Sequence, residues 1–228
     1  EKIAIVGYNG AGKSTLIKLL MRLYDVNSGQ ILWNGENIKN FDPAYYRKHI
    51  GAVFQDYKIF SATIAENVMG GEFDKKDEKT VLDALDRATF TEKLKTIDKG
   101  IYANLTREFD DNGISLSGGE AQKIAIARVF AHPYDLIIMD EPSSALDPIA
   151  EFELNRSIAE YAKDKTVIFI SHRLSTTRNA DKIYMFADGE VIENGSHNDL
   201  IAQNGKYAEM FNMQAEKYNK NFETAVVI

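Results

Sequence analysis

The feature that most constrains the fold is a glycine-rich run directly after a short apolar segment. Lys2–Val6 is rich in Ile and Val and ends at Gly7, which is typical of a buried strand in a parallel sheet. The run Gly7–Ser14 (GYNGAGKS) fits the pattern G-x-x-x-x-G-K-[ST], and Leu16–Leu23 follows with apolar residues at helical spacing. A strand, a glycine-rich loop and a helix in this order direct backbone N–H groups at a polyphosphate. We therefore expect Lys13 to reach the β- and γ-phosphates of a nucleotide and the Ser14 hydroxyl to ligate Mg²⁺.

Strand-like and helix-like segments alternate along the rest of the chain. Residues 58–131 carry apolar positions at helical spacing and are predicted to form a mostly helical insertion. Asn34-Gly35 and Asp188-Gly189 are two-residue turn signals. The alternation predicts an α/β fold with a largely parallel sheet. The further strands are expected at Gln30–Trp33, Gly51–Phe54, Asp135–Asp140, Thr166–Ser171, Lys182–Ala187 and Glu190–Glu193, with helices at 148–163 and 197–219.

Composition excludes several classes of protein. The 228 residues are 44% hydrophobic and 27% charged, which excludes a disordered chain. No apolar run approaches the roughly 20 residues of a membrane-spanning helix, so we expect this chain not to cross a bilayer by itself. The absence of cysteine excludes a disulfide scaffold, and the net charge of −7 argues against a broad nucleic-acid-binding surface. Because Glu1–Gly7 begins directly in a strand-like run, we expect the chain to be a fragment of a longer protein.

Two further motifs bear on chemistry. The apolar strand Leu136–Met139 is followed by Asp140, which can hold Mg²⁺ through its water shell, and by Glu141, which can polarise a water for in-line attack on a γ-phosphate. Leu116–Glu120 (LSGGE) precedes an apolar-periodic helix, with Ser117 as a natural N-cap. By itself this motif predicts a capped helix. It is also a second anion-binding helix start in a chain that already has a phosphate loop.

With these motifs the chain resembles the nucleotide-binding domain of an ABC transporter of the exporter type, because LSGG separates that family from other P-loop ATPases. The resemblance runs nearly end to end. Segments 60–67, 171–176 and 187–195 are more similar to exporters than to importers. The matches are Gly7–Ser14 to the Walker A loop, Gln55 to the Q-loop glutamine, Leu116–Glu120 to the signature, Leu136–Glu141 to Walker B, Ser144–Asp147 to the D-loop and His172 to the switch histidine.

The resemblance implies a fold and a set of site residues. The fold is a P-loop NTPase core with a mixed, mainly parallel sheet, an inserted helical subdomain and an antiparallel β element, in a single domain over residues 1–228. The RecA-like core would span about residues 1–57 and 132–228, and the helical subdomain about 58–131. The implied cofactors are ATP and Mg²⁺. The catalytic residues would be Glu141, His172 and Gln55, and the metal ligands Ser14, Gln55 and Asp140. The nucleotide-binding residues would be Gly7, Asn9, Gly10, Ala11, Gly12, Lys13, Ser14, Thr15, Ser117, Gly118, Gly119 and Asp147.

The resemblance also implies partners. We expect a transmembrane domain preceding Glu1 in the same polypeptide, and a second nucleotide-binding domain in a head-to-tail dimer around two MgATP. No nucleic-acid partner is expected. The location would be the cytoplasmic face of the cell membrane, with this chain soluble by itself. Two alternatives stay open: a soluble ABC ATPase that acts on ribosomes or DNA, and a regulatory domain that binds ATP without turnover. Intact Glu141 and His172 argue against the latter.

Two segments depart from the family pattern. Glu120 stands where Gln is usual, which places an extra negative charge near a phosphate-facing loop. The stretch Thr106–Gly113 is a poor copy of the exporter segment before the signature, a segment that the family links to contact between domains. His49, His132 and His197 are interpreted as surface or loop residues.

Overall fold

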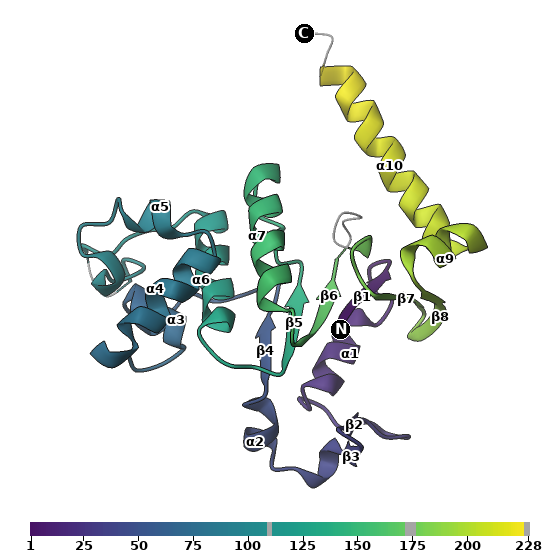
Figure 1. Cartoon of the computed structure of the whole chain (residues 1–228), viewed down its shortest axis with the longest axis horizontal. Helices are drawn as coiled ribbons and strands as arrows, with labels where there is room; N and C mark the ends of the chain where they lie inside the picture. Colours follow the sequence, from purple (N-terminus) through teal and green to yellow (C-terminus); the bar gives the residue numbers. More distant parts are fainter. Residues whose placement is uncertain (109–110, 172–176, 226–228) are drawn as a thin grey trace. The chain divides into compact units, whose positions relative to one another are not determined.

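The computed structural model describes residues 1–108, 111–171 and 177–225 (Figure 1). It divides into two compact units. The first unit comprises Glu1–Pro43 and Val167–Ile228, and the second comprises Ala44–Thr166. Within the described residues, no helix is both long enough and apolar enough to span a bilayer.

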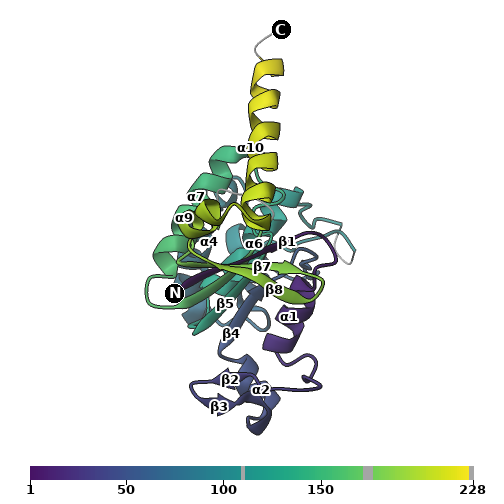
Figure 2. The same ribbon diagram turned by 90° about the vertical axis from the view of Figure 1, so that its right-hand side faces the viewer.

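The first unit is built on the strand order β6-β1-β7-β8. β1 (Lys2–Gly7) pairs in parallel with β6 (Thr166–Ile170) and with β7 (Lys182–Ala187). β8 (Glu190–Gly195) pairs antiparallel with β7, and Figure 2 shows β1, β7 and β8 side by side. The apolar run of β1 is buried, as expected for a strand covered on both faces. The predicted buried parallel strand is confirmed.

Both predicted two-residue turns are present in this unit. Asn34 and Gly35 join β2 (Leu32–Trp33) to β3 (Glu36–Asn37), and Asp188 and Gly189 join β7 to β8. All four turn residues have φ between 51° and 86°, which is the geometry of a type I′ turn. The strand predicted at Gln30–Trp33 is shorter in the structure, because only Leu32 and Trp33 pair with another strand.

The first unit contains α1 (Lys13–Leu20), α9 (His197–Gln203) and α10 (Lys206–Ala225), with a 3₁₀ turn at Ile38–Asn40, among its described residues. The continuous helix expected over 197–219 is therefore broken in two. Asn204 adopts φ 52° and ends α9, and the carboxylate of Glu193 then accepts the N–H groups of Lys206 and Tyr207 at the start of α10. A distant carboxylate thus caps the second helix, a tertiary contact that helical periodicity does not reveal.

The second unit places a parallel strand pair beside a helical region. β4 (Ile50–Val53) pairs with β5 (Leu136–Asp140). Three helices of this region, α3 (Ile64–Met69), α4 (Glu78–Arg87) and α6 (Gly118–Phe130), pack against one another. Ile64, Leu85 and Ile124 are among the fully buried side chains of these helices. The elements that build or flank this region are α2 (Pro43–Arg47), α3 (Ile64–Met69), a 3₁₀ turn (Lys75–Asp77), α4 (Glu78–Arg87), α5 (Thr91–Leu94), a 3₁₀ turn (Gly100–Tyr102), α6 (Gly118–Phe130) and α7 (Pro148–Tyr161).

Helices α3 to α6 all lie within the region 58–131 that the periodicity predicted to be helical. The division of the chain into a core of residues 1–57 and 132–228 and a helical subdomain of residues 58–131 stays a prediction.

One strained residue in the helical region yields a prediction about stability. Thr89 follows α4 with φ 57°, a left-handed conformation that a β-branched residue rarely adopts. Its hydroxyl oxygen is buried and has no hydrogen-bond partner among the described residues. Glycine would relieve both defects, so we expect Thr89→Gly to raise the free energy of unfolding by about 1 kcal/mol in urea titrations.

The matched control is Gly100→Ala. Gly100 has a similar φ of 53° and open space around it, so the added methyl group should lower stability by about 1 kcal/mol. A loss of stability in Thr89→Gly would contradict the assignment of strain to Thr89.

Candidate functional site

The glycine-rich loop of the first unit curls between β1 and α1. The Ala11 N–H donates to the Tyr8 carbonyl oxygen over 3.2 Å, and Gly12 caps α1 with φ 99°. The helix begins at Lys13, three residues before the predicted start, so Ser14 and Thr15 belong to its first turn. Since the first N–H groups of a helix have no partner within it, the loop ends in a set of donors at the positive end of α1.

The turn between β7 and β8 packs directly against this loop. The Gly189 N–H donates to the Ala11 carbonyl oxygen over 3.1 Å. A Cβ atom on Gly7 would lie 2.4 Å from the Phe186 carbonyl oxygen, and one on Gly12 would lie 3.2 Å from Gly189 Cα. Glycine at both positions therefore permits a backbone approach that a side chain would block.

Lys13 is held inside the loop. Its side chain is only 7% exposed, and its Nζ donates to the carbonyl oxygens of Gly7 (2.7 Å) and Tyr8 (2.9 Å). The neighbouring positions Asn9, Gly10 and Ser14 are exposed. The Lys13 ammonium is thus held in a loop whose exposed positions offer backbone N–H donors. This arrangement suits the binding of an anionic ligand.

In the second unit, three predicted site residues follow the ends of two neighbouring strands. Asp140 ends β5, and Gln55 lies in an exposed turn just after β4, whose Val53 is level with Met139 in the parallel pair. Glu141 adopts φ 53°, an uncommon conformation for a residue with a side chain. Because the carboxyl ends of parallel strands meet at one edge, Gln55, Asp140 and Glu141 share that edge.

The signature segment forms a capped helix start, as predicted. The Ser117 hydroxyl accepts the N–H of Glu120 (3.3 Å), and the Glu120 carboxylate accepts the N–H of Ser117 (2.8 Å). This reciprocal capping box leaves Gly118 and Gly119 in the first turn of α6. Asp147 likewise caps α7, and the N–H groups of Ala150 and Ile149 hold the pKa of its carboxyl below the usual value.

Two side chains that sequence reasoning missed connect these segments. The Tyr57 hydroxyl, two residues beyond Gln55, donates to the Gly118 carbonyl oxygen over 2.7 Å. Gln122 of α6 is 1% exposed, and its Nε2 donates to the Glu141 carbonyl oxygen (3.1 Å) and to Ser144 Oγ (3.2 Å), while its Oε1 accepts the Ala145 N–H (3.1 Å). Gln122 stands three, four and seven positions before the buried Ala125, Ile126 and Val129, so an amide on the apolar face of the helix is the signal that could have identified it.

Not every predicted site residue can be placed. His172, the predicted switch histidine, lies outside the described residues, as do Phe109 and Asp110 of the segment before the signature. The glycine-rich loop belongs to the first unit, whereas Gln55, the signature and residues 140–147 belong to the second.

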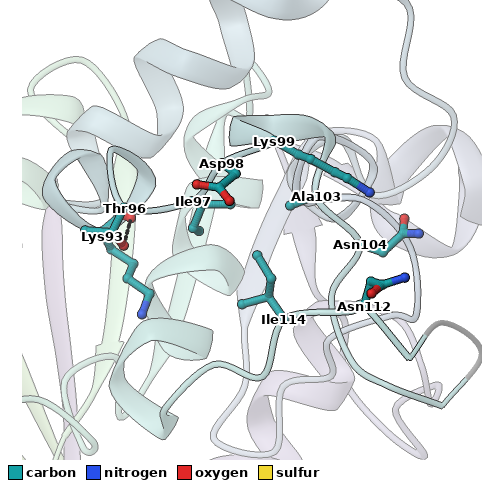
Figure 3. Close-up of a pocket in the computed structure, with 9 residues that line it drawn as sticks. All are labelled: Lys93, Thr96, Ile97, Asp98, Lys99, Ala103, Asn104, Asn112 and Ile114. Carbon is teal, nitrogen blue, oxygen red and sulfur yellow. Dashed lines mark hydrogen bonds between the residues drawn. The ribbon is translucent and has the colours of Figure 1, made fainter.

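Two hollows in the second unit lie away from the predicted site residues. A pocket of about 510 Å³ lies in the helical region of the second unit, with Ile97 and Ile114 as apolar lining and Lys93 and Lys99 as basic lining (Figure 3). A second hollow, of about 650 Å³, lies beside α4 and α7. None of the predicted site residues lines either one.

Comparison with known proteins decides the family. The sequence model described as "ABC transporter" matches residues 1–144. The chain belongs to the ABC transporter family. The relatives and the solved structure that it resembles are named as exporters.

Relatives of this ABC domain are longer proteins. It is 40% identical over 214 residues to a Staphylococcus aureus (strain NCTC 8325) protein named for multidrug export as an ATP-binding/permease protein, and 39% identical to the protein so named in the bovine strain RF122. Each match covers 94% of this chain but only 36% of the relative, so the chain spans about a third of the curated relatives it matches.

A solved structure of a bacterial Atm1-family ABC exporter with ATP bound matches with a TM-score of 0.85 and 35% identity, over 94% of this chain and 37% of that chain. This likeness confirms the predicted P-loop fold with its mainly parallel sheet and antiparallel β element.

The Gln122 contacts yield a prediction. Replacing Gln122 by Met keeps the approximate volume but leaves the Ala145 N–H without its acceptor, so we expect the ABC domain to lose about 2 kcal/mol of unfolding free energy. Gln203→Met, on an exposed position of α9, is the control and should change stability by less than about 0.5 kcal/mol. Equal denaturation curves for the two variants would show that the hydrogen bonds of Gln122 do not stabilise the segment 141–145 after β5.

Proposed function

We propose that this ABC domain binds and hydrolyses MgATP and thereby drives export across a membrane from its cytoplasmic face. The observation that carries the proposal is the position of Lys13, a buried cation within a glycine-rich loop at the positive end of α1. The names of the relatives, which combine multidrug export with an ATP-binding/permease protein, support the transport half of the proposal.

In this proposal the chain's own residues divide the work on the nucleotide. The backbone N–H groups of Gly10 to Thr15 bind the phosphates, and the Lys13 ammonium turns from the loop carbonyls to the β- and γ-phosphates. The carboxylate of Glu141 accepts a proton from the attacking water and orients it. Gln55 and His172 complete the group around the γ-phosphate, and Asp147 joins it from the D-loop.

The oxygen donors available fit Mg²⁺. Ser14, Gln55 and Asp140 would supply a hydroxyl, an amide oxygen and a carboxylate, all hard ligands. Among the described residues, no group of three or more His, Cys, Asp or Glu side chains could hold a metal ion by itself. That suits an ion that arrives with the phosphates rather than one held in a protein cage. When bound, Mg²⁺ would neutralise charge that develops on the β- and γ-phosphate oxygens.

We further propose two partners and a domain organisation. A second copy or a similar domain faces this one head to tail, so that Ser117, Gly118 and Gly119 contact the γ-phosphate held by the other chain. A transmembrane domain in the same polypeptide would receive the motion of opening and closing. Residues 58–131 would act as a helical subdomain beside the core of residues 1–57 and 132–228.

The alternative is a soluble ABC ATPase that acts on ribosomes or DNA. It fits less well, because the relatives are named for export and the chain carries a net charge of −7. Binding to RNA or DNA in 0.15 M salt would favour this alternative.

The first functional prediction concerns Lys13. Lys13→Ala removes a charge-assisted contact to the phosphates, so MgATP affinity should fall roughly ten- to hundredfold and hydrolysis should be lost. The circular dichroism spectrum should be retained, because the ammonium contacts carbonyl groups of the loop itself. Lys18→Ala, an exposed position in the last turn of α1, is the control. Normal phosphate release by Lys13→Ala would show that the loop is misassigned.

The second functional prediction concerns assembly. Glu141→Gln keeps the size of the side chain but removes the base, so the variant should bind MgATP, fail to hydrolyse it and shift toward a dimer in light scattering. Adding Ser117→Arg should abolish that dimer without reducing nucleotide binding by the monomer. Ser28→Arg, at another exposed serine, should leave the dimer intact. A chain that stays monomeric at high protein and MgATP concentration would contradict the composite site.

A further inference from the structure

Glu120 presents a charge problem for the proposed function. It lies in the first turn of α6, beside Ser117, Gly118 and Gly119, where the γ-phosphate of the other chain would bind. Partial burial raises the pKa of its carboxyl, but the N–H of Ser117 and the ammonium of Lys93 outweigh this and hold the pKa below the usual value. The side chain therefore carries a full negative charge at neutral pH, close to an anionic ligand.

Both oxygens of this carboxylate are already engaged. Oε2 accepts the Ser117 N–H at 2.8 Å, and Oε1 lies 3.0 Å from Lys93 Nζ. Lys93 comes from α5, and its side chain is one of those drawn in Figure 3. The two side chains are only 35% and 26% exposed, so solvent screens their attraction less than that of a fully exposed pair.

We propose that Lys93 is a positioning residue for the signature motif, which makes Glu120 compatible with an anionic ligand at Ser117–Gly119. The ion pair turns the carboxylate toward α5 and compensates its charge, so the positive end of α6 still attracts phosphate. The proposal rests on the proposed function, because it concerns the γ-phosphate contact of the second chain. The ligand chemistry is a nucleoside triphosphate held by another domain.

A purely structural ion pair would behave differently. If the pair only fastened α5 to α6, Lys93→Met and Glu120→Gln would each break it and would weaken dimerisation alike. If Lys93 compensates charge, Lys93→Met should weaken dimerisation, whereas Glu120→Gln, which removes the charge that needs compensation, should not. The two single variants therefore separate the roles, and the double variant shows whether the effect of Lys93→Met depends on Glu120.

The experiment compares wild type, Lys93→Met, Glu120→Gln and the double variant. Hydrolysis is measured as kcat and KM, and MgATP-induced dimerisation is measured in the Glu141→Gln background, at 0.05 and 0.3 M salt. We expect Lys93→Met to raise the protein concentration needed for half-maximal dimerisation by roughly three- to tenfold at low salt, and less at high salt. Nucleotide binding by the monomer should be unchanged, because the glycine-rich loop is untouched. Glu120→Gln alone should keep or strengthen dimerisation, and in its background Lys93→Met should have no effect on dimerisation.

Two further variants act as controls. Lys93→Arg keeps the charge and should retain dimerisation. Lys95→Met, two positions along, removes an ion pair with Glu92 (2.6 Å) on the same segment and should leave hydrolysis and dimerisation unchanged.

The outcomes separate this inference from the proposed function. Three results would overturn the role of Lys93 and leave the proposed function standing. They are weaker dimerisation by Glu120→Gln alone, an equal effect of Lys93→Met with and without Glu120→Gln, and no effect of Lys93→Met on a dimer that Ser117→Arg abolishes. Normal hydrolysis by both Lys13→Ala and Ser117→Arg would instead remove the proposed function itself.

Discussion

The parallel pairing of β1 with β6 and β7 is the interaction on which the first unit depends. Because β1 is hydrogen-bonded on both edges and buried on both faces, its end at Gly7 is fixed in space. The loop must leave the sheet there and turn at once into α1. The Phe186 carbonyl and the β7–β8 turn then close off the space behind it. A phosphate-binding loop needs such rigidity, since donors that are already oriented need not be ordered when the ligand arrives.

In the second unit, hydrogen bonds from polar side chains hold the backbone segments of the predicted site in place. Gln122 is buried on the apolar face of α6, and it joins α6 to the backbone beyond β5 at the Glu141 carbonyl oxygen. The hydroxyl of Tyr57 joins the segment after Gln55 to the first turn of the same helix, at the Gly118 carbonyl oxygen. A buried amide with its hydrogen bonds satisfied specifies one arrangement of the loop, because any other arrangement would leave donors without partners. The left-handed backbone at Glu141 is held by the same contacts.

Glu120 shows how a departure from a family pattern changes meaning once its surroundings are known. In the sequence it is a negative charge near a phosphate-facing loop. In the structure it completes a capping box and forms an ion pair with Lys93, 27 positions earlier in the chain. The carboxylate is charged in both descriptions, but only the tertiary structure shows where it points and which cation pairs with it.

The sequence by itself determined the order of strands and helices, the two type I′ turns, the glycine-rich loop and the capped start of α6, because each is set by residues close together in the chain. Asn34-Gly35 needs only its own left-handed preference, and Ser117 needs only the N–H of Glu120. The tertiary structure decided where the predicted C-terminal helix breaks, since Glu193 of strand β8 caps the start of α10. It also revealed Gln122, Tyr57 and Lys93, whose partners lie between 19 and 61 positions away. Local patterns reflect local preferences, whereas these contacts form only when distant segments pack together. A helical pattern can therefore mark Gln122 as unusual, but it cannot identify the partners of Gln122, Tyr57 or Lys93.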